Sequence, residues 1–296
     1  MACLFGARLC RVSGVTLMGT WPEAIERIVR EGIQVEEGED RWRALPAVRR
    51  LGDGVEPADL VLVLVKSHRT AALAPHAALA RGPAGRILTL QNGLGNAEAL
   101  VAAAGALHVD VGVTTAGAAL LGPGHVRVSG LGRTHLAPSP DAPRTAALLG
   151  AAGFPTEIAD DLRLVVWRKL VANCAINAPS ALRGIRNGAL LDSPTDRARL
   201  EAAAREVGAV ASALGIQLGA DAAEIALGVA RATPGNRSSM LQDLERGVAT
   251  EVDAINGAVV REGRRLGVAT PVNEALWREV LARQARGGGR APQTSP

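Results

Sequence analysis

The apolar pattern changes character about halfway along the 296-residue chain, and this change constrains the fold more than any other feature. Before it, short apolar runs alternate with stretches of helical periodicity, which is typical of strand–helix–strand units with a parallel sheet. The run at residues 60–65 is apolar at every position, as expected of a central parallel strand with helices on both faces. After about Phe154 every periodic stretch is helical. The sequence therefore predicts an α/β domain followed by an all-helical domain.

The element boundaries follow from the same periodicity and from the positions of glycine and proline. We expect strands at residues 15–18, 86–90 and 108–114, a helix at 22–31 that Gly32 closes, and turns with short strands at 117–135. We expect helices at residues 162–182, 193–214, 220–232, 239–247, 250–266 and 272–283. The predicted domains are 1–155 and 156–286, followed by a Gly/Pro/Arg-rich tail at 287–296 that we expect to be disordered.

The start of the chain is unusual for a sheet of this kind. A dinucleotide-binding sheet opens with a strand, a glycine-rich turn and a helix whose N-terminus receives the pyrophosphate. Here residues 2–9 have a helical pattern, and neither a strand nor Gly-x-Gly-x-x-Gly precedes them. We expect a start site placed downstream of the first strand and glycine loop; the alternative is a different fold that begins with a helix.

Composition excludes several classes of protein. The longest aliphatic run has six residues, whereas a membrane helix needs roughly 20. The arginines are scattered and aromatic residues make up only 2% of the chain, which argues against a nucleic-acid surface. Neither the three cysteines nor the histidines have metal-ligand spacing, so we expect no metal site, reduced thiols and a cytoplasmic protein.

Lysine is nearly absent. Lys and Arg total 33, and Lys66 and Lys169 are the only lysines among them. A site that keeps lysine in such a chain needs what arginine cannot offer, a compact ammonium whose pKa falls on burial. Chance survival of two lysines is the alternative.

Polar residues follow two successive predicted strands. Lys66 comes directly after the run at 60–65, and Gln91-Asn92-Gly93 follows the strand at 86–90. Ligands of open α/β sheets lie beyond the carboxyl ends of the strands, so both groups point to one crevice. The alternative is a solvated strand end and an ordinary Asn-Gly turn.

A second group of polar residues lies on one predicted helix. Lys169, Asn173 and Asn177 follow each other at intervals of four residues, which places them on one helix face. Asparagine costs roughly 0.6 kcal/mol relative to alanine inside a helix, so two on one face suggest a polar ligand. A hydrogen-bonding stripe between domains is the alternative.

Two further segments begin helices. Ser239 is the expected N-cap of the helix at 239–247, with Gln242 completing a capping box, and an N-terminus of this kind also attracts carboxylates. Glu251 lies at the start of the next helix, where an acid also suits the helix dipole.

Taken together, these motifs resemble the ketopantoate reductase (2-dehydropantoate 2-reductase) family over about residues 1–280. The resemblance rests on Val65-Lys66, Gln91-Asn92-Gly93-Leu94-Gly95-Asn96, Lys169-Leu170-Val171-Ala172-Asn173 with Asn177, Asn187-Gly188, Asn236-Arg237-Ser238-Ser239-Met240-Leu241-Gln242-Asp243 and Thr250-Glu251-Val252-Asp253 with Ile255-Asn256-Gly257. It implies a Rossmann-type domain at 1–155 that lacks its first strand, and a helical domain at 156–286 for substrate binding or dimerisation. NADPH and a 2-oxo acid would meet between the two.

The resemblance also implies a role for particular residues. Lys169 would donate the proton to the carbonyl oxygen as hydride arrives, and Glu251 would be an acid at the cleft that binds substrate or cofactor. The implied substrate contacts are Asn92, Asn173, Asn177, Asn187 and Ser239. The implied cofactor contacts are Lys66, Asn92, Gly93, Ala118 and Glu251.

The implied reaction is NADPH-dependent reduction of 2-dehydropantoate to (R)-pantoate in pantothenate and coenzyme A synthesis. Gly19-Thr20-Trp21 stand where the family usually offers an arginine for the NADPH 2′-phosphate, so NADH stays open. The alternatives are a reductase of another 2-oxo acid and a member impaired by the missing glycine loop. The expected partner is a small 2-oxo acid, without nucleic acid or membrane, and a homodimer is possible.

Overall fold

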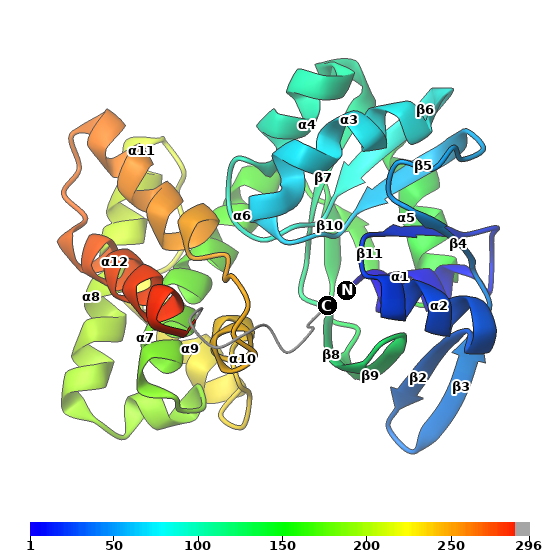
Figure 1. Ribbon diagram of the computed structural model, residues 1–296. Helices are drawn as coiled ribbons and strands as arrows, with labels where there is room; N and C mark the ends of the chain where they lie inside the picture. Colours follow the sequence, from blue (N-terminus) through cyan, green and yellow to red (C-terminus); the bar gives the residue numbers. More distant parts are fainter. Residues whose placement is uncertain (288–296) are drawn as a thin grey trace.

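The structure, a computed structural model, describes residues 1–287 of the chain. A half built around β-sheet lies beside a half built from helices, and α6 is the first helix after the last strand (Figure 1). Apart from Gly287, which ends α12, the predicted tail at 287–296 lies outside the described residues. In the described part of the chain, no helix is long and apolar enough to cross a membrane.

The first half opens with a helix, as its sequence predicts. The helices are α1 (Ala2–Leu9), α2 (Pro22–Glu31), α3 (Thr70–Ala80), α4 (Asn96–Ala104) and α5 (Ala142–Ala151), with short 3-10 turns at Ser67–Arg69 and Ala106–His108. The strands are β1 (Thr16–Gly19), β2 (Ile33–Glu37), β3 (Asp40–Ala44), β4 (Ala47–Arg50), β5 (Ala58–Val63), β6 (Arg81–Thr89), β7 (Val109–Thr114), β8 (Gly117–Gly122), β9 (His125–Gly130), β10 (Thr134–Leu136) and β11 (Thr156–Ile158).

The strands form three sheets. The largest has the order β11-β10-β7-β6-β5, in which β5, β6 and β7 are parallel and β10 is antiparallel to β7. A parallel pair joins β1 to β4, and a four-stranded sheet has the order β3-β2-β9-β8. The parallel run β5-β6-β7 matters for function, because the carboxyl ends of its strands lie along one edge.

The prediction that residues 60–65 form a central strand is half right. Both faces are covered: Leu60 and Leu62 pack in the cluster of Leu4 in α1, whereas Val61 packs with Ala74 in α3 on the other face. However, β5 is the edge of its sheet and pairs with β6 alone among the described strands. An apolar sequence reports what covers the two faces of a strand and carries no information about its hydrogen-bonding edges.

The helical half contains α6 (Leu162–Ala172), α7 (Ala178–Arg183), α8 (Pro194–Ala213), α9 (Ala222–Ala232), α10 (Ser239–Glu245), α11 (Ala258–Leu266) and α12 (Pro271–Gly287), with a 3-10 turn at Gly188–Leu191. One apolar core joins these helices, and its side chains include Leu200, Leu227 and Leu276. The predicted helix at 162–182 is interrupted by a π-helical turn at Asn173–Asn177. A second π turn, at Asp253–Gly257, begins the helix predicted at 250–266.

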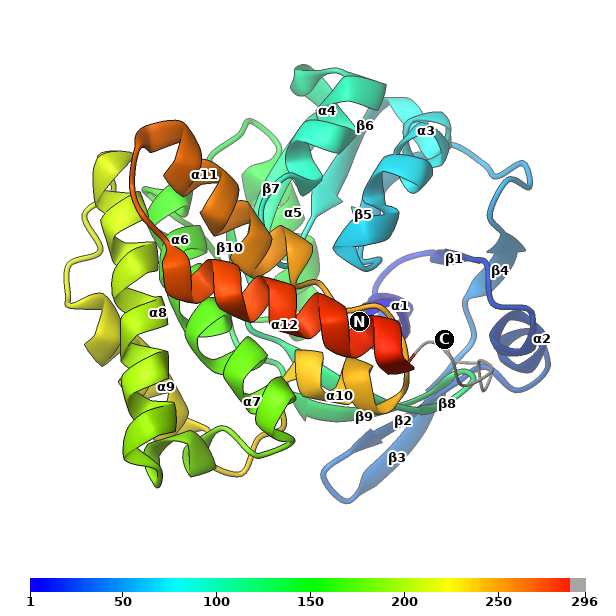
Figure 2. The same ribbon diagram turned by 60° about the vertical axis from the view of Figure 1, so that its left-hand side comes forward.

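The two halves meet where α1 begins. Lys66 and Glu251 are near enough to Met1 to affect the pKa of its amino group, which burial lowers. Figure 2 shows α10 and the C-terminal end of α12 on the side of the molecule where α1 lies. In the middle of α1, the ring of Phe5 stacks on that of Phe154 with 4.0 Å between centroids, which fixes α1 against the large sheet.

Candidate functional site

Three parallel strands deliver the first part of the site. Lys66 follows β5, Asn92 follows β6, and Thr114 ends β7. Polar side chains tie the first two loops together: Gln91 Nε2 donates to the Val65 carbonyl at 2.7 Å, and Ser67 Oγ donates to the Asn92 carbonyl at 2.8 Å. The loops that carry Lys66 and Asn92 therefore lie side by side at the carboxyl ends of β5 and β6.

Lys66 joins this edge to the helical half. Its Nζ lies 2.6 Å from Asp243 Oδ2 in α10 and 3.7 Å from Glu251 Oε2. The side chain of Asp243 is 6% exposed, and burial raises its pKa in spite of the nearby ammonium. Two carboxylates thus converge on one lysine across the boundary between the halves.

Glu251 is held by hydrogen bonds from the sheet half. Its Oε1 accepts from the Ser67 backbone N–H at 3.1 Å and lies 3.0 Å from Ser67 Oγ, and its Oε2 accepts from Asn92 Nδ2 at 3.1 Å. Glu251 is buried. Sequence reasoning missed Ser67, although its place beside Lys66 at a strand end was a usable signal.

Lys169 reaches the same edge from α6. Its Nζ donates to the Thr114 carbonyl at 2.6 Å. Burial lowers the pKa of Lys169 from 10.5 to about 8, and the charge of Glu251 opposes this shift. An ammonium with such a pKa can both donate a proton near neutral pH and be reloaded from solvent.

Asn173 and Asn177 extend the polar stripe from Lys169. Both are half-buried, and neither carboxamide forms a hydrogen bond within residues 1–287, so their donors and acceptors are free for a ligand. The π turn supports this arrangement. In an α-helix a residue four positions on overshoots the first by about 40°, and the wider π turn reduces the overshoot.

Of the other predicted substrate residues in the helical half, Asn187 directly precedes the 3-10 turn at Gly188–Leu191, and Ser239 is the first residue of α10. Asn187 is 8% exposed, and its Nδ2 donates to Thr233 Oγ1 at 3.0 Å. Its Oδ1 is buried and has no hydrogen-bond partner in the described part of the chain.

Ser239 is exposed, and the prediction that it caps α10 is wrong. Ser238 is the N-cap, with its Oγ accepting from the Leu241 N–H at 3.2 Å, because the helix begins one residue earlier than the capping-box pattern suggested. The side chain of Gln242 donates to the Arg237 carbonyl instead of completing a capping box.

The predicted cofactor residues Gly93 and Ala118 and the N-terminus of α1 lie in three different environments. The first turn of α1 contains no acidic residue, and Lys66, Glu251 and Arg246 are near enough to its N-terminus to affect the pKa of the Met1 amino group. A helix N-terminus attracts anions such as a pyrophosphate. Gly93 has φ +81°, and a Cβ there would lie 2.3 Å from the Ala254 carbonyl oxygen, so close packing on the helical half already requires glycine. Ala118 lies in β8 and packs against two apolar clusters.

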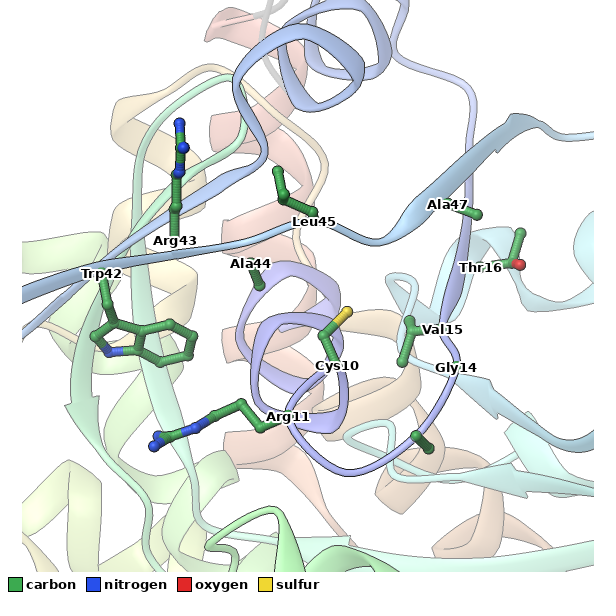
Figure 3. Close-up of a pocket in the computed structure, with 11 residues that line it drawn as sticks. Cys10, Arg11, Gly14, Val15, Thr16, Trp42, Arg43, Ala44, Leu45 and Ala47 are labelled. Atoms are coloured by element: carbon green, nitrogen blue, oxygen red, sulfur yellow. The ribbon is translucent and has the colours of Figure 1, made fainter.

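Two cavities in the described part of the chain lie away from these residues. One of about 610 Å³ lies between the end of α1, the start of β1 and β3, with Arg11, Trp42 and Leu45 in its wall (Figure 3). Another of about 490 Å³ lies between α10 and the end of α12. None of the predicted site residues lines either cavity. Among the described residues, no group of His, Cys, Asp and Glu could hold a metal ion.

Comparisons with known proteins show the family of the chain. The family model described as "Ketopantoate reductase PanE/ApbA" matches residues 1–141, and that of the "Ketopantoate reductase PanE/ApbA C terminal" matches residues 161–284. A 2-dehydropantoate 2-reductase of Halobacterium salinarum is 39% identical over 271 residues, which cover 89% of each chain. One of Vibrio cholerae is 35% identical over 232 residues, covering 75% of this chain and 77% of the relative.

Solved structures are similar over nearly the whole length. A PanE/ApbA family ketopantoate reductase from Ralstonia eutropha has a TM-score of 0.90 and 33% identity, with 96% of this chain and 95% of that one covered. A D-mandelate dehydrogenase with NADH and anilino(oxo)acetate also has a TM-score of 0.90, over 96% of this chain and 95% of that one, and at 24% identity it shares the fold. The chain belongs to the ketopantoate reductase family.

Proposed function

We propose that this chain reduces a 2-oxo acid with a nicotinamide cofactor, and that the substrate is 2-dehydropantoate, reduced to (R)-pantoate for coenzyme A synthesis. One observation carries the proposal: Lys169, with its pKa lowered to about 8, lies at the carboxyl ends of three parallel strands beside Glu251 and two unpaired carboxamides. The relatives named 2-dehydropantoate 2-reductase support the choice of substrate.

The residues of the chain divide the work of this reaction. Lys66 and the N-terminus of α1 would hold the anionic part of the cofactor, with Asn92, Gly93 and Ala118 as the further proposed contacts. When bound, the reduced nicotinamide supplies the hydride. Lys169 stabilises the negative charge that develops on the carbonyl oxygen and gives that oxygen its proton. The Thr114 carbonyl holds the ammonium in place before substrate arrives.

Substrate recognition falls to the helical half. Asn173 and Asn177 offer donors to the carboxylate and carbonyl, and Ser239 and Asn187 offer hydroxyl and amide groups at the far end of the substrate. Glu251 accepts a hydrogen bond from a substrate hydroxyl while Ser67 and Asn92 hold its carboxylate. This division assigns cofactor binding to residues 1–155 and substrate binding, or dimerisation, to residues 156–286.

The choice of nucleotide is the finer part of the proposal. We propose NADPH, as the family resemblance implies. NADH is the competitor, because Gly19-Thr20-Trp21 offer no arginine after β1. A basic side chain at this point would favour the 2′-phosphate through a charge-assisted hydrogen bond. Comparing kcat/KM for the two nucleotides decides between them.

The test is an assay of the purified chain with 2-dehydropantoate and a panel of other 2-oxo acids. Turnover is measured as the loss of the absorbance of the reduced nicotinamide. We expect turnover, a preference for 2-dehydropantoate, and a loss of about 10²–10⁴-fold in kcat for Lys169→Ala. Turnover that survives this substitution would overturn the role of Lys169. A panel in which another 2-oxo acid is preferred would replace the substrate, and no reduction of any member would overturn the function.

A further inference from the structure

Both segments that carry the proposed chemistry pass into π turns. Lys169 is followed by the π turn Asn173–Asn177, and Glu251 is followed by the π turn Asp253–Gly257. Short π segments are rare in proteins and frequently lie at functional sites. Two of them in contact within one small region point to a specific requirement for their relative placement.

A buried asparagine links the two π turns. Asn256, which is 0% exposed, lies within the second π turn, and its Nδ2 donates to the carbonyl of Cys174 in the first at 3.2 Å. The same Nδ2 donates to Asn273 Oδ1 at 3.0 Å. The two hydrogens of one amide therefore connect three separate segments.

Asn273, which accepts one of these hydrogen bonds, is itself held by hydrogen bonds to α8. Asn273 Nδ2 lies 2.8 Å from Glu206 Oε2 and 3.0 Å from the Ala203 carbonyl, both in α8. Glu206 also accepts from the backbone N–H groups of Val272 and Asn273 at the start of α12. The chain of hydrogen bonds thus runs from α8 through α12 to Asn256 and ends on the π turn after Lys169.

In the side chain of Asn256, the Nδ2 amide group forms hydrogen bonds and the Oδ1 carbonyl oxygen does not. Its Oδ1 is buried without a hydrogen-bond partner in the described part of the chain. A buried, unpaired carbonyl costs free energy, so packing alone does not explain an amide here. The Nδ2 donors, which fix one π turn against the other, do explain it.

We propose that Asn256 is a positioning residue that sets the placement of Glu251 relative to Lys169, an inference that rests on the proposed function. Within the second segment the Ile255 N–H donates to the Glu251 carbonyl at 3.0 Å, so a shift of Asn256 is passed to Glu251. A displacement of about 1 Å at a reacting geometry is enough to cost about 100-fold in rate.

The experiment compares Asn256→Asp and Asn256→Ser with Val210→Ala. The aspartate keeps the shape of the side chain but puts an acceptor against two acceptor oxygens, and the serine is the milder variant if the aspartate fails to fold. Val210 is 0% exposed in α8, takes no part in the hydrogen bonds that lead from α8 to Asn256, and serves as a core variant that loses stability. Melting temperature, kcat, KM and the titration of Lys169 are measured for each.

The titration of Lys169 is readable without any substrate. The chain has two lysines, so trace labelling with acetic anhydride at a series of pH values, followed by peptide mass spectrometry, resolves Lys169 from Lys66. Glu251 is the charged side chain that raises the pKa of Lys169 against the effect of burial, which leaves it at about 8. If Glu251 moves away, the labelling curve of Lys169 shifts to lower pH.

We expect Asn256→Ser, which adds no charge, to shift the Lys169 curve to lower pH, and both Asn256 variants to lower kcat/KM about 10- to 100-fold, whereas Val210→Ala lowers the melting temperature and leaves both values unchanged. An unshifted Lys169 curve in folded Asn256→Ser, or a full kcat/KM in either folded Asn256 variant, would overturn the proposal. Should the wild-type chain reduce no 2-oxo acid, the labelling curves still decide the geometry, and only the proposed function fails.

Discussion

The single residue on which most of the chemistry depends is Lys169, and its pKa gives the sign of a pH effect. The proposed proton donor must be protonated, and the pKa of its ammonium is about 8. We therefore expect kcat/KM to be constant below this pH and to fall about tenfold per unit above it. Lys169→Arg, which stays charged throughout, removes this alkaline decline along with most activity. Initial rates between pH 6 and 10 check this, and a flat profile for the wild-type chain would contradict it.

The same shift has the opposite consequence for stability. Folding lowers the pKa of Lys169 from 10.5, so between about 8 and 10.5 the unfolded chain binds more protons, and stability rises with pH. The cost of the buried ammonium is fully present below about pH 8. Lys169→Met should thus stabilise the chain at pH 7 by about 1–3 kcal/mol, with the gain shrinking towards pH 10. Urea unfolding at both pH values measures it; a gain independent of pH would contradict the assignment.

Two neighbouring serines separate a structural role from a binding role. Ser238 caps α10, and its Oγ is 2.8 Å from Ser180 Oγ, whereas Ser239 is exposed. Ser238→Ala should cost about 1 kcal/mol of stability through loss of the cap. Ser239→Ala should leave stability unchanged and raise KM for the 2-oxo acid severalfold. Each variant controls for the other in urea unfolding and steady-state assays, and the reverse pattern would exchange the two roles.

At the scale of elements, periodicity predicted which segments are helices and strands but not how they are joined. The helix at 22–31 matches α2, and the strands at 86–90 and 108–114 correspond to β6 and β7. The edge position of β5 and the two π turns could not be predicted. Edge pairing is set by which strands come together in space, and a single π turn is too short to change the apolar periodicity of the helix around it detectably.

A glycine pair tests how the loop after β6 contacts the second π turn. Gly93 and Gly95 have φ values of +81° and +90°, so alanine strains the backbone equally at both. A Cβ at Gly93 would also collide with the backbone of Ala254, whereas at Gly95 it meets nothing within 4 Å. Gly93→Ala should therefore lose more stability than Gly95→Ala, by at least about 1 kcal/mol, and should lower kcat/KM as well. Equal losses in thermal unfolding would refute the contact.

At the scale of the whole molecule, the site exists because residues far apart in sequence meet. Strand ends, helix spacing and the rarity of lysine allowed Lys66, Asn92 and Lys169 to be singled out from the sequence one at a time, whereas Glu251 was singled out only by the family resemblance. It could not predict that Lys66 meets Asp243, 177 positions away, or that Ser67 donates to Glu251. Such contacts depend on how two folded halves dock, which no local pattern encodes.

The Lys66–Asp243 pair should therefore be worth more to the whole molecule than a surface ion pair. The Lys66 and Asp243 side chains are 37% and 6% exposed and bridge the two halves, whereas Arg144 and Asp59, 3.1 Å apart, are 74% and 84% exposed within the sheet half. Burial strengthens the attraction between charges and limits screening by salt, and exposed pairs contribute about 0–1 kcal/mol. A double-mutant cycle with Lys66→Met and Asp243→Asn should give a coupling energy above about 1 kcal/mol.

The matched cycle with Arg144→Met and Asp59→Asn should give less than about 0.5 kcal/mol. The first coupling should also persist in 0.5 M NaCl, at roughly the ionic strength where the second has disappeared. Because Glu251 lies 3.7 Å from the same ammonium, it offers Lys66 a second partner when Asp243 is neutral. The coupling energy is then a lower bound on what holds the halves together through Lys66. Equal couplings for the two pairs would mean that docking of the halves depends on the apolar and backbone contacts around Gly93, and not on this charge.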